Sequence, residues 1–165
     1  MNSSVSFIDL QESNLPKVKE IYDYYILNST ATFHTDPIKI EELKEFIFIN
    51  HPIYKSYIIK CDEEIIGYCY LTYFKKRQAY NRTAEVTIYL SHTSHKKGIG
   101  FIALNHLENI AKEKSIKNLL GIISGDNEAS IKLFEKCDYF KCSHFKSVGE
   151  KFGKILDVVA YQKEI

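Results

Sequence analysis

One short stretch of the chain combines a carboxylate with a glycine-containing loop. A strand-like run from Glu85 to Leu90 lies four residues before His95-Lys96-Lys97-Gly98-Ile99-Gly100, where an apolar helical pattern begins. The first amides of a helix lack backbone partners and the helix dipole is positive there, so such a loop favours phosphate. Gly98 and Gly100 let a ligand approach the backbone closely. The stretch therefore predicts a site for a phosphate-bearing cofactor beside a proton acceptor, Glu85.

The composition is that of an ordinary folded protein without a strong charge bias. The chain has 165 residues, of which 45% are hydrophobic, and a formal net charge of +1. This length predicts a single domain spanning 1–165. The small net charge argues against nucleic acid or an anionic membrane as a partner. No apolar run approaches the roughly 20 residues that a membrane span needs, and the N-terminus lacks a signal-peptide pattern, so we expect a soluble, cytoplasmic protein.

The cysteines and histidines do not have the spacing of a metal site. Zinc sites typically pair cysteines about two to four residues apart, whereas the four cysteines lie at 61, 69, 137 and 142. His92 and His95 are close together but have no third ligand near them in the sequence. We therefore predict no metal and expect structural thiols.

Hydrophobic periodicity predicts an alternating order of strands and helices. The predicted strands are 6–8, 57–61, 65–73, 83–90, 119–123, 139–144 and 155–161. The predicted helices cover about 15–26, 40–50, 99–111 and 127–136, and the first of them has its start signal at Ser13. Loops are predicted at 30–37 and 74–82. Three consecutive strands followed by alternating helices and strands predict an α/β (α+β) fold with a mixed sheet and helices on both faces.

Four motifs, in order along nearly the whole chain, resemble one known family. They are Ala31-Thr32-Phe33, the run 84–90, the run 127–133 and Gly149-Glu150-Lys151-Phe152-Gly153. With the loop at 95–100, they make the chain similar to the GNAT superfamily of acyl-CoA-dependent N-acetyltransferases. Within it, they resemble the phosphinothricin and methionine sulfoximine acetyltransferases. The resemblance implies a mixed, mostly antiparallel central sheet and acetyl-CoA as the cosubstrate, without a metal.

The resemblance also implies which residues bind acetyl-CoA. The loop of His95, Lys96, Lys97, Gly98, Ile99 and Gly100 would hold the pyrophosphate. The strand end of Ile88, Tyr89 and Leu90 would offer backbone groups to the pantetheine arm, as in strand addition. Asn127 would hydrogen-bond that arm, with Ser130 near it. Phe134 stands where many members carry Tyr or His, so a proton for the leaving thiolate must come from elsewhere.

Acetyl transfer to an amine needs a proton acceptor, because an amino group is largely protonated near neutral pH. The resemblance implies that Glu85 is this general base. Its reference pKa is about 4.3, so burial must raise the pKa or a water must relay the proton. A salt bridge with Arg82 or Arg77 is the structural alternative. A backbone N–H of a bulged central strand is the expected donor to the oxyanion.

A basic cluster between two predicted strands could bind the acceptor. Lys75, Lys76 and Arg77 suit a carboxylate, because guanidinium forms paired hydrogen bonds with it. Phe33 and Tyr80 would be the apolar walls of the substrate site. A solvated basic surface is the alternative for this cluster.

These observations predict an enzyme that transfers acetyl from acetyl-CoA to the primary amine of a small carboxylate-bearing molecule. Phosphinothricin, methionine sulfoximine or a similar amino acid analogue is the expected acceptor, which would make the reaction a detoxification. A protein or peptide N-acetyltransferase and a non-catalytic acyl-CoA-binding regulatory module remain alternatives. The resemblance further implies a homodimer, with residues 151–154 near the second subunit and the pocket.

Overall fold

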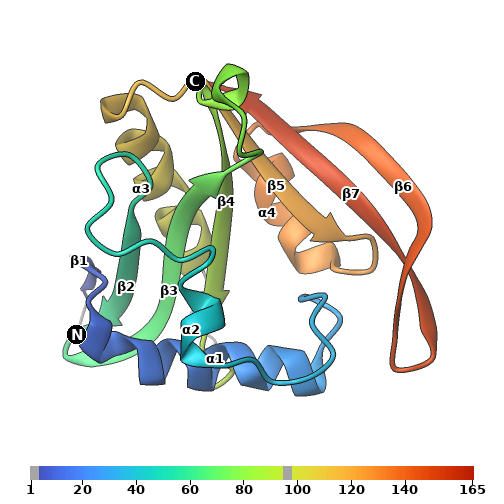
Figure 1. Ribbon diagram of the computed structural model, residues 1–165, viewed down its shortest axis with the longest axis horizontal. Coiled ribbons are helices and arrows are strands. Elements are labelled where there is room, and N and C mark those ends of the chain that lie inside the picture. The colour runs from blue at the N-terminus through green and yellow to red at the C-terminus, as the bar shows by residue number, and fades with distance from the viewer. Residues whose placement is uncertain (1–3, 95–97) are drawn as a thin grey trace.

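A seven-stranded sheet in the order β1-β2-β3-β4-β5-β7-β6 runs through the molecule (Figure 1). The computed structural model describes residues 4–94 and 98–165. The strands are β1 (Val5–Asp9), β2 (Ser56–Cys61), β3 (Glu64–Tyr73), β4 (Thr83–Leu90), β5 (Asn118–Ser124), β6 (Phe140–Lys151) and β7 (Lys154–Glu164). The helices are α1 (Leu15–Asn28), α2 (Ile40–Leu43), α3 (Ile99–Glu113) and α4 (Glu128–Lys136), with short 3-10 turns η1 (Glu12–Asn14) and η2 (Gln78–Tyr80). Neighbouring strands are antiparallel except β4 and β5, which confirms the mixed, mostly antiparallel sheet.

Each face of the sheet has its own apolar core. Strand side chains alternate between the faces, so Ile58 lies under α1 and α2 whereas Ile59 lies under α3. Tyr68 lies in the same core as Ile58, and Leu71 lies in the same core as Ile59. All four side chains are fully buried. This alternation confirms that helices cover both faces.

The prediction of a helix over 40–50 was wrong beyond its first turn. Helix α2 ends at Leu43, and the chain continues as turns in which Phe46 N–H bonds to the Leu43 carbonyl, a contact between residues three apart. The run from Phe46 to Ile49 is aromatic and β-branched, and such residues lose side-chain freedom in a helix. Burial of Leu43 and Ile47 in the core fixes these turns instead, and Asn50, at φ 57°, ends them.

The last two strands form a hairpin that is longer than predicted. The sequence predicted strands at 139–144 and 155–161, whereas β6 and β7 together run from Phe140 to Glu164. They are joined at Phe152 and Gly153, which both have positive φ values of 54° and 69°. The hairpin extends beyond the rest of the sheet (Figure 1), and β6 is its edge strand.

The sheet splits between β4 and β5. Their parallel pairing covers residues 83–85 and 118–120 and ends at the pair Glu85–Leu120. Beyond that pair the strands separate, and the gap widens toward the loop that follows α1 (Figure 1). The backbone of β4 beyond Glu85 therefore has no strand partner in β5 within the described part of the chain, and this opening positions the site.

Candidate active site

A cavity of about 800 Å³ lies at the split of the sheet. Its walls are residues 29–34 after α1, residues 85–90 of β4, residues 121–123 of β5 and the first turns of α3 and α4. Ligand pockets for small molecules typically have volumes of roughly 300–1,000 Å³. The separation of two parallel strands thus produces a cavity large enough for a small ligand and part of a cofactor.

Glu85 is a half-buried carboxyl on the wall of this cavity. It pairs with Thr72 of β3 and Leu120 of β5, at the last pair before the strands diverge. Burial raises the pKa of Glu85 from 4.5 to about 7, because a desolvated carboxylate is less stable than its protonated form. Among the described residues no ion pair joins Glu85 to Arg82 or Arg77, so the salt-bridge alternative has no support here.

Tyrosine hydroxyls surround the part of the cavity near α1. The Tyr22 hydroxyl lies 2.7 Å from Thr32 Oγ1 and 2.7 Å from His34 Nδ1, and Tyr25 donates a 2.6 Å hydrogen bond to the Leu90 carbonyl. Burial raises the pKa of both tyrosines, so they stay protonated near neutral pH.

Sequence reasoning missed these tyrosines as cavity residues. Tyr22 and Tyr25 recur at the apolar spacing of the predicted helix 15–26, and a cavity wall has the same helical spacing as a core face. Tyr70, which also lines the cavity, lies in a strand that reads as core throughout. No local signal in the sequence distinguishes these positions.

The start of α3 brings one residue of the predicted cofactor loop to the cavity. Gly98 caps the helix at φ 92°, a left-handed conformation that favours glycine. Gly100 lines the cavity, whereas Gly98 is exposed outside the lining and Ile99 is buried in the core. The predictions for His95, Lys96 and Lys97 lie outside the described residues.

The start of α4 forms the opposite side of the cavity. Asn127 caps this helix by accepting a 3.2 Å hydrogen bond from the Ser130 amide, and both residues line the cavity. Phe134, one helical turn further on, also lines it and packs edge-on against Tyr139. Asn127 therefore has a structural role in addition to the cofactor contact predicted for it.

The predicted substrate residues divide into two groups. Phe33 lines the cavity. Lys75, Lys76, Arg77 and Tyr80 are not part of its lining. Lys75 Nζ lies over the rings of Phe74 and Tyr80, at 5.2 Å and 5.7 Å from their centroids, and Lys76 Nζ lies 5.1 Å from the centroid of Tyr73. The structure thus keeps the two lysines on local aromatic residues.

The expected strand bulge is not in β4. Strands β3 and β4 pair without a register shift from residue 67 to residue 90. The register shifts lie elsewhere: Ile59 pairs with Gly67 and Lys60 with Ile65, so Ile66 of β3 is the extra residue there, and two further shifts occur in β6. The opening in β4 arises from the departure of β5, so β4 stays regular along its contact with β3. In the part of the chain that the structure describes, no group of His, Cys, Asp and Glu could hold a metal, and no helix is long and apolar enough to cross a membrane.

Comparison with protein families identifies this architecture. Residues 9–160 match a family described as the acetyltransferase (GNAT) domain. Because the match covers nearly the whole chain, the fold and the split sheet are those of an acetyl-CoA-dependent acetyltransferase. The chain belongs to the GNAT acetyltransferase family.

Individual relatives and structures agree with this membership. YwnH of Bacillus subtilis (strain 168), to which a phosphinothricin acetyltransferase function is provisionally given, is 31% identical over 94% of this chain and 96% of its own. The L-methionine sulfoximine/L-methionine sulfone acetyltransferase of Pseudomonas paraeruginosa is 24% identical, over 96% and 94% of the two chains. The phosphinothricin acetyltransferase (Pat) of Sinorhizobium meliloti, solved in complex with AcCoA, has a TM-score of 0.88 and 26% identity, covering 100% of this chain and 89% of that one.

The cavity fits the acetyl donor of this family. The β4 backbone beyond Glu85 is open toward β5, where a pantetheine arm can add as a strand does. Two helices, α3 and α4, begin at the cavity, and helix N-termini suit phosphate and carbonyl oxygens. The residues present can therefore hold acetyl-CoA, which supplies the activated acetyl group when bound.

Proposed function

We propose that the protein acetylates the primary amine of a small carboxylate-bearing molecule, such as phosphinothricin, methionine sulfoximine or a similar amino acid analogue, with Glu85 as general base. The observation that carries this proposal is the half-buried Glu85 carboxyl on the cavity wall, with its pKa raised to about 7. A base with this pKa is substantially ionised near neutral pH and can still accept a proton. The names of the relatives support the acceptor class.

The reaction then proceeds through a deprotonated amine. Glu85 takes a proton from the ammonium group, directly or through a water. The amine nitrogen attacks the thioester carbonyl carbon, so the C–N bond forms as the carbonyl electron pair moves onto oxygen, and the carbonyl forms again as the C–S bond breaks. The sulfur leaves as a thiol after it takes up the proton that the nitrogen loses. Phe134 has no acidic proton, so it cannot protonate the sulfur itself. Backbone N–H groups of β4 beyond Glu85 are the proposed donors to the carbonyl oxygen, because pre-oriented amides stabilise developing negative charge.

The cosubstrate residues are proposed from their place on the cavity. Ile88, Tyr89, Leu90, Gly100, Asn127 and Ser130 line it and are proposed to contact acetyl-CoA. Gly98 and Ile99 would act indirectly, by setting where α3 begins. Phosphate binding by the loop 95–97 stays a prediction from the sequence.

Acceptor binding is assigned to Phe33, which lines the cavity. Carboxylate binding by Lys75, Lys76 and Arg77, with Tyr80 as a wall, stays a prediction because these residues lie outside the lining. A cytoplasmic location and a detoxification role also remain predictions from the sequence.

A homodimer through the β6–β7 hairpin is part of the proposal. Large apolar side chains lie exposed along this hairpin: Phe140, Phe145, Val148, Phe152 and Ile155, each at least 54% exposed. Apolar surface gathered in one place commonly marks an interface. The hairpin includes the edge strand β6, which is also able to pair with another chain.

The test is CoA release by the purified protein with a panel of amines. Phosphinothricin, methionine sulfoximine and methionine sulfone form one arm, the same compounds with a blocked carboxylate form a second, and short peptides with free N-termini form a third. Turnover confined to the first arm supports the proposal. Turnover of the peptides alone would favour a peptide acetyltransferase, and acetyl-CoA binding without any turnover would favour a non-catalytic module.

A further inference from the structure

The segment Ser29–His34, here called the acceptor loop, forms one wall of the cavity without regular secondary structure. All six of its residues line the cavity. It follows α1 and lies far in sequence from β5 and the hairpin. Because it has no strand or helix ladder of its own, side-chain contacts must hold it in place.

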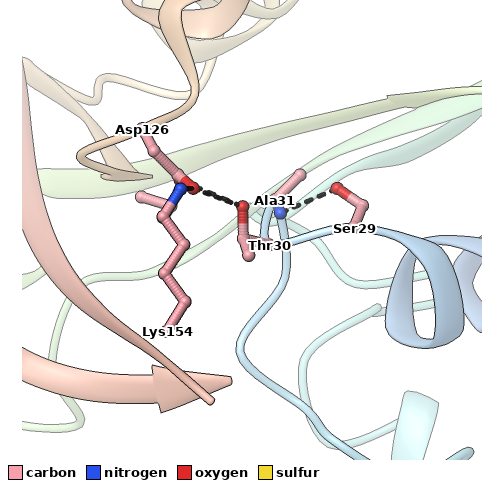
Figure 2. A network of polar contacts seen from close by, with 6 residues as sticks. Ser29, Thr30, Ala31, Asp126 and Lys154 are labelled. Carbon is pink, nitrogen blue, oxygen red and sulfur yellow. Dashed lines mark hydrogen bonds and ion pairs between the residues drawn. The ribbon is translucent and has the colours of Figure 1, made fainter. Parts of the chain in front are cut away.

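Asp126 holds one end of the acceptor loop. The Thr30 hydroxyl lies 2.8 Å and 3.0 Å from the two Asp126 oxygens. Lys154, at the start of β7, contacts the same carboxylate at 2.7 Å (Figure 2). Ser124, at the end of β5, donates to it at 2.6 Å. One carboxylate thus joins the acceptor loop, the last residue of β5 and the hairpin.

This carboxylate stays charged at every working pH. Burial alone would raise the pKa of Asp126, but hydrogen bonds from Lys154, Ser124 and Thr30 outweigh it and set the pKa at about 2. Donors aimed at a carboxylate favour its ionised form. The contact therefore does not titrate in the range where Glu85 does.

The hairpin also contacts the acceptor loop directly, through Lys151. This side chain is only 3% exposed, and its Nζ donates a 2.9 Å hydrogen bond to the Thr32 carbonyl. Lys151 and Lys154 flank the turn of the hairpin. The hairpin turn therefore holds the acceptor loop directly through Lys151 and indirectly through Lys154 and Asp126.

Asp126 also directly precedes Asn127, the cap of α4. A shift of the Asp126 backbone would thus reach both the acceptor wall and the helix start on the opposite side. Its position in the chain links the two sides of the cavity.

We propose that Asp126 is a positioning residue for acceptor binding, which holds the acceptor loop against the cavity through Thr30 while Lys154 fixes the carboxylate from the hairpin. This inference rests on the proposed function, since the loop is the acceptor wall only if an amine binds there. It assigns no part in the chemical step to Asp126. Its loss should weaken acceptor binding and leave chemistry largely intact.

The test uses two variants and a matched control. Thr30→Val removes the hydroxyl, and Asp126→Asn removes the charge that Lys154 and Thr30 contact. The control is Thr35→Val, because Thr35 makes a similar bond at 3.1 Å to Asp36, but is exposed and outside the cavity lining. The readouts are steady-state kinetics for both substrates and hydrogen exchange of the 29–34 amides.

We expect both variants to raise the acceptor KM about tenfold, the typical effect of losing a hydrogen bond to a charged group. The KM for acetyl-CoA and kcat should stay within about twofold of wild type. Exchange of the 29–34 amides should accelerate in both variants and not in Thr35→Val. The double variant should be no worse than the poorer single one, because the two residues form one contact.

An unchanged acceptor KM in both single variants overturns the inference. An equal rise in the KM for the acceptor and the KM for acetyl-CoA overturns it too. If the wild-type protein acetylates no amine, the proposed function fails instead. The exchange comparison then decides whether Asp126 holds the loop, and unchanged exchange overturns that claim as well.

Discussion

Glu85 has a raised pKa because it lies partly buried at the last pair of β4 and β5, where the two strands separate. Its alternation along β4 turns it toward the face of α1, and the departure of β5 opens a cavity beside it. Enough burial remains to raise its pKa to about 7. A carboxyl with its reference pKa would be a weak base at neutral pH. The local environment thus adjusts an ordinary side chain to the reaction.

Replacing Glu85 by Gln should lower kcat by at least about a hundredfold, because it removes the general base and keeps the side chain's size. Acetyl-CoA affinity should not change. In the wild type, kcat/KM should rise with pH through about 7 as Glu85 ionises, and this rise should be absent in the variant. Glu64→Gln, an exposed carboxyl outside the cavity, is the control. An unchanged rate in Glu85→Gln would leave Glu85 a structural residue.

The same raised pKa makes a prediction for stability. The unfolded chain ionises Glu85 near pH 4.5 and the folded protein near pH 7, so the folded state binds the proton more tightly. The contribution of Glu85 to stability is therefore largest below pH 4.5 and falls until about pH 7. Glu85→Gln should be more stable than wild type at pH 8, with a smaller difference at pH 4. Thermal unfolding at both pH values checks this, and the reverse order would contradict the burial argument.

Close packing between α4 and β5 shapes the far wall of the cavity. A Cβ atom on Gly121 would lie 2.3 Å from the ring of Phe134. Phe134 is itself held by the edge-on contact with Tyr139, at 4.9 Å between ring centroids. The helix can approach the strand this closely because position 121 has no side chain.

Gly121→Ala should therefore destabilise the protein by about 1–3 kcal/mol, the usual cost of overpacking a core. Gly149→Ala is the matched control, because its Cβ would meet nothing closer than 3.7 Å. Chemical denaturation measures both. A second substitution, Phe134→Leu, should recover part of the loss in Gly121→Ala. Equal stability of the two alanine variants would show that Phe134 moves aside without cost.

The hairpin of β6 and β7 both contacts the wall of the cavity and carries an exposed apolar surface. Its turn contacts the acceptor loop directly through Lys151 and indirectly through the contact of Lys154 with Asp126, while its exposed apolar side chains offer a surface to a second copy. Any interface built on this hairpin would therefore lie close to residues that hold the acceptor loop. Assembly and acceptor binding would then be linked through one element.

Val148→Glu should convert the proposed dimer into a monomer, because it places a charge within the apolar surface of the hairpin. Val148 is 59% exposed, so the folded monomer should tolerate the change. Leu27→Glu, at a similarly exposed site on α1 (55%), should leave the dimer intact. Light scattering coupled to size exclusion gives the mass of each. A monomeric wild type would contradict the dimer proposal.

The elements with strong local patterns could be predicted from the sequence. The strand at 83–90 and the helix that starts at Ile99 lie where their periodicity puts them, because alternation and helical spacing are properties of neighbouring residues. The helix predicted over 40–50 ends at Leu43, because the aromatic and β-branched residues 46–49 lose side-chain freedom in a helix, a cost that apolar spacing alone does not show. The hairpin was underestimated because β6 is mostly exposed and so lacks an apolar alternation.

The amino-acid order by itself determined the kinds of elements, their succession and the carboxylate on β4. The tertiary structure alone decided that β5 leaves β4 after residue 120, that Tyr22 and Tyr70 face a cavity, and that Asp126 meets Thr30. Such contacts join residues far apart in the chain, and no local periodicity encodes them. The pKa of Glu85 belongs with them, because desolvation depends on everything packed around the group.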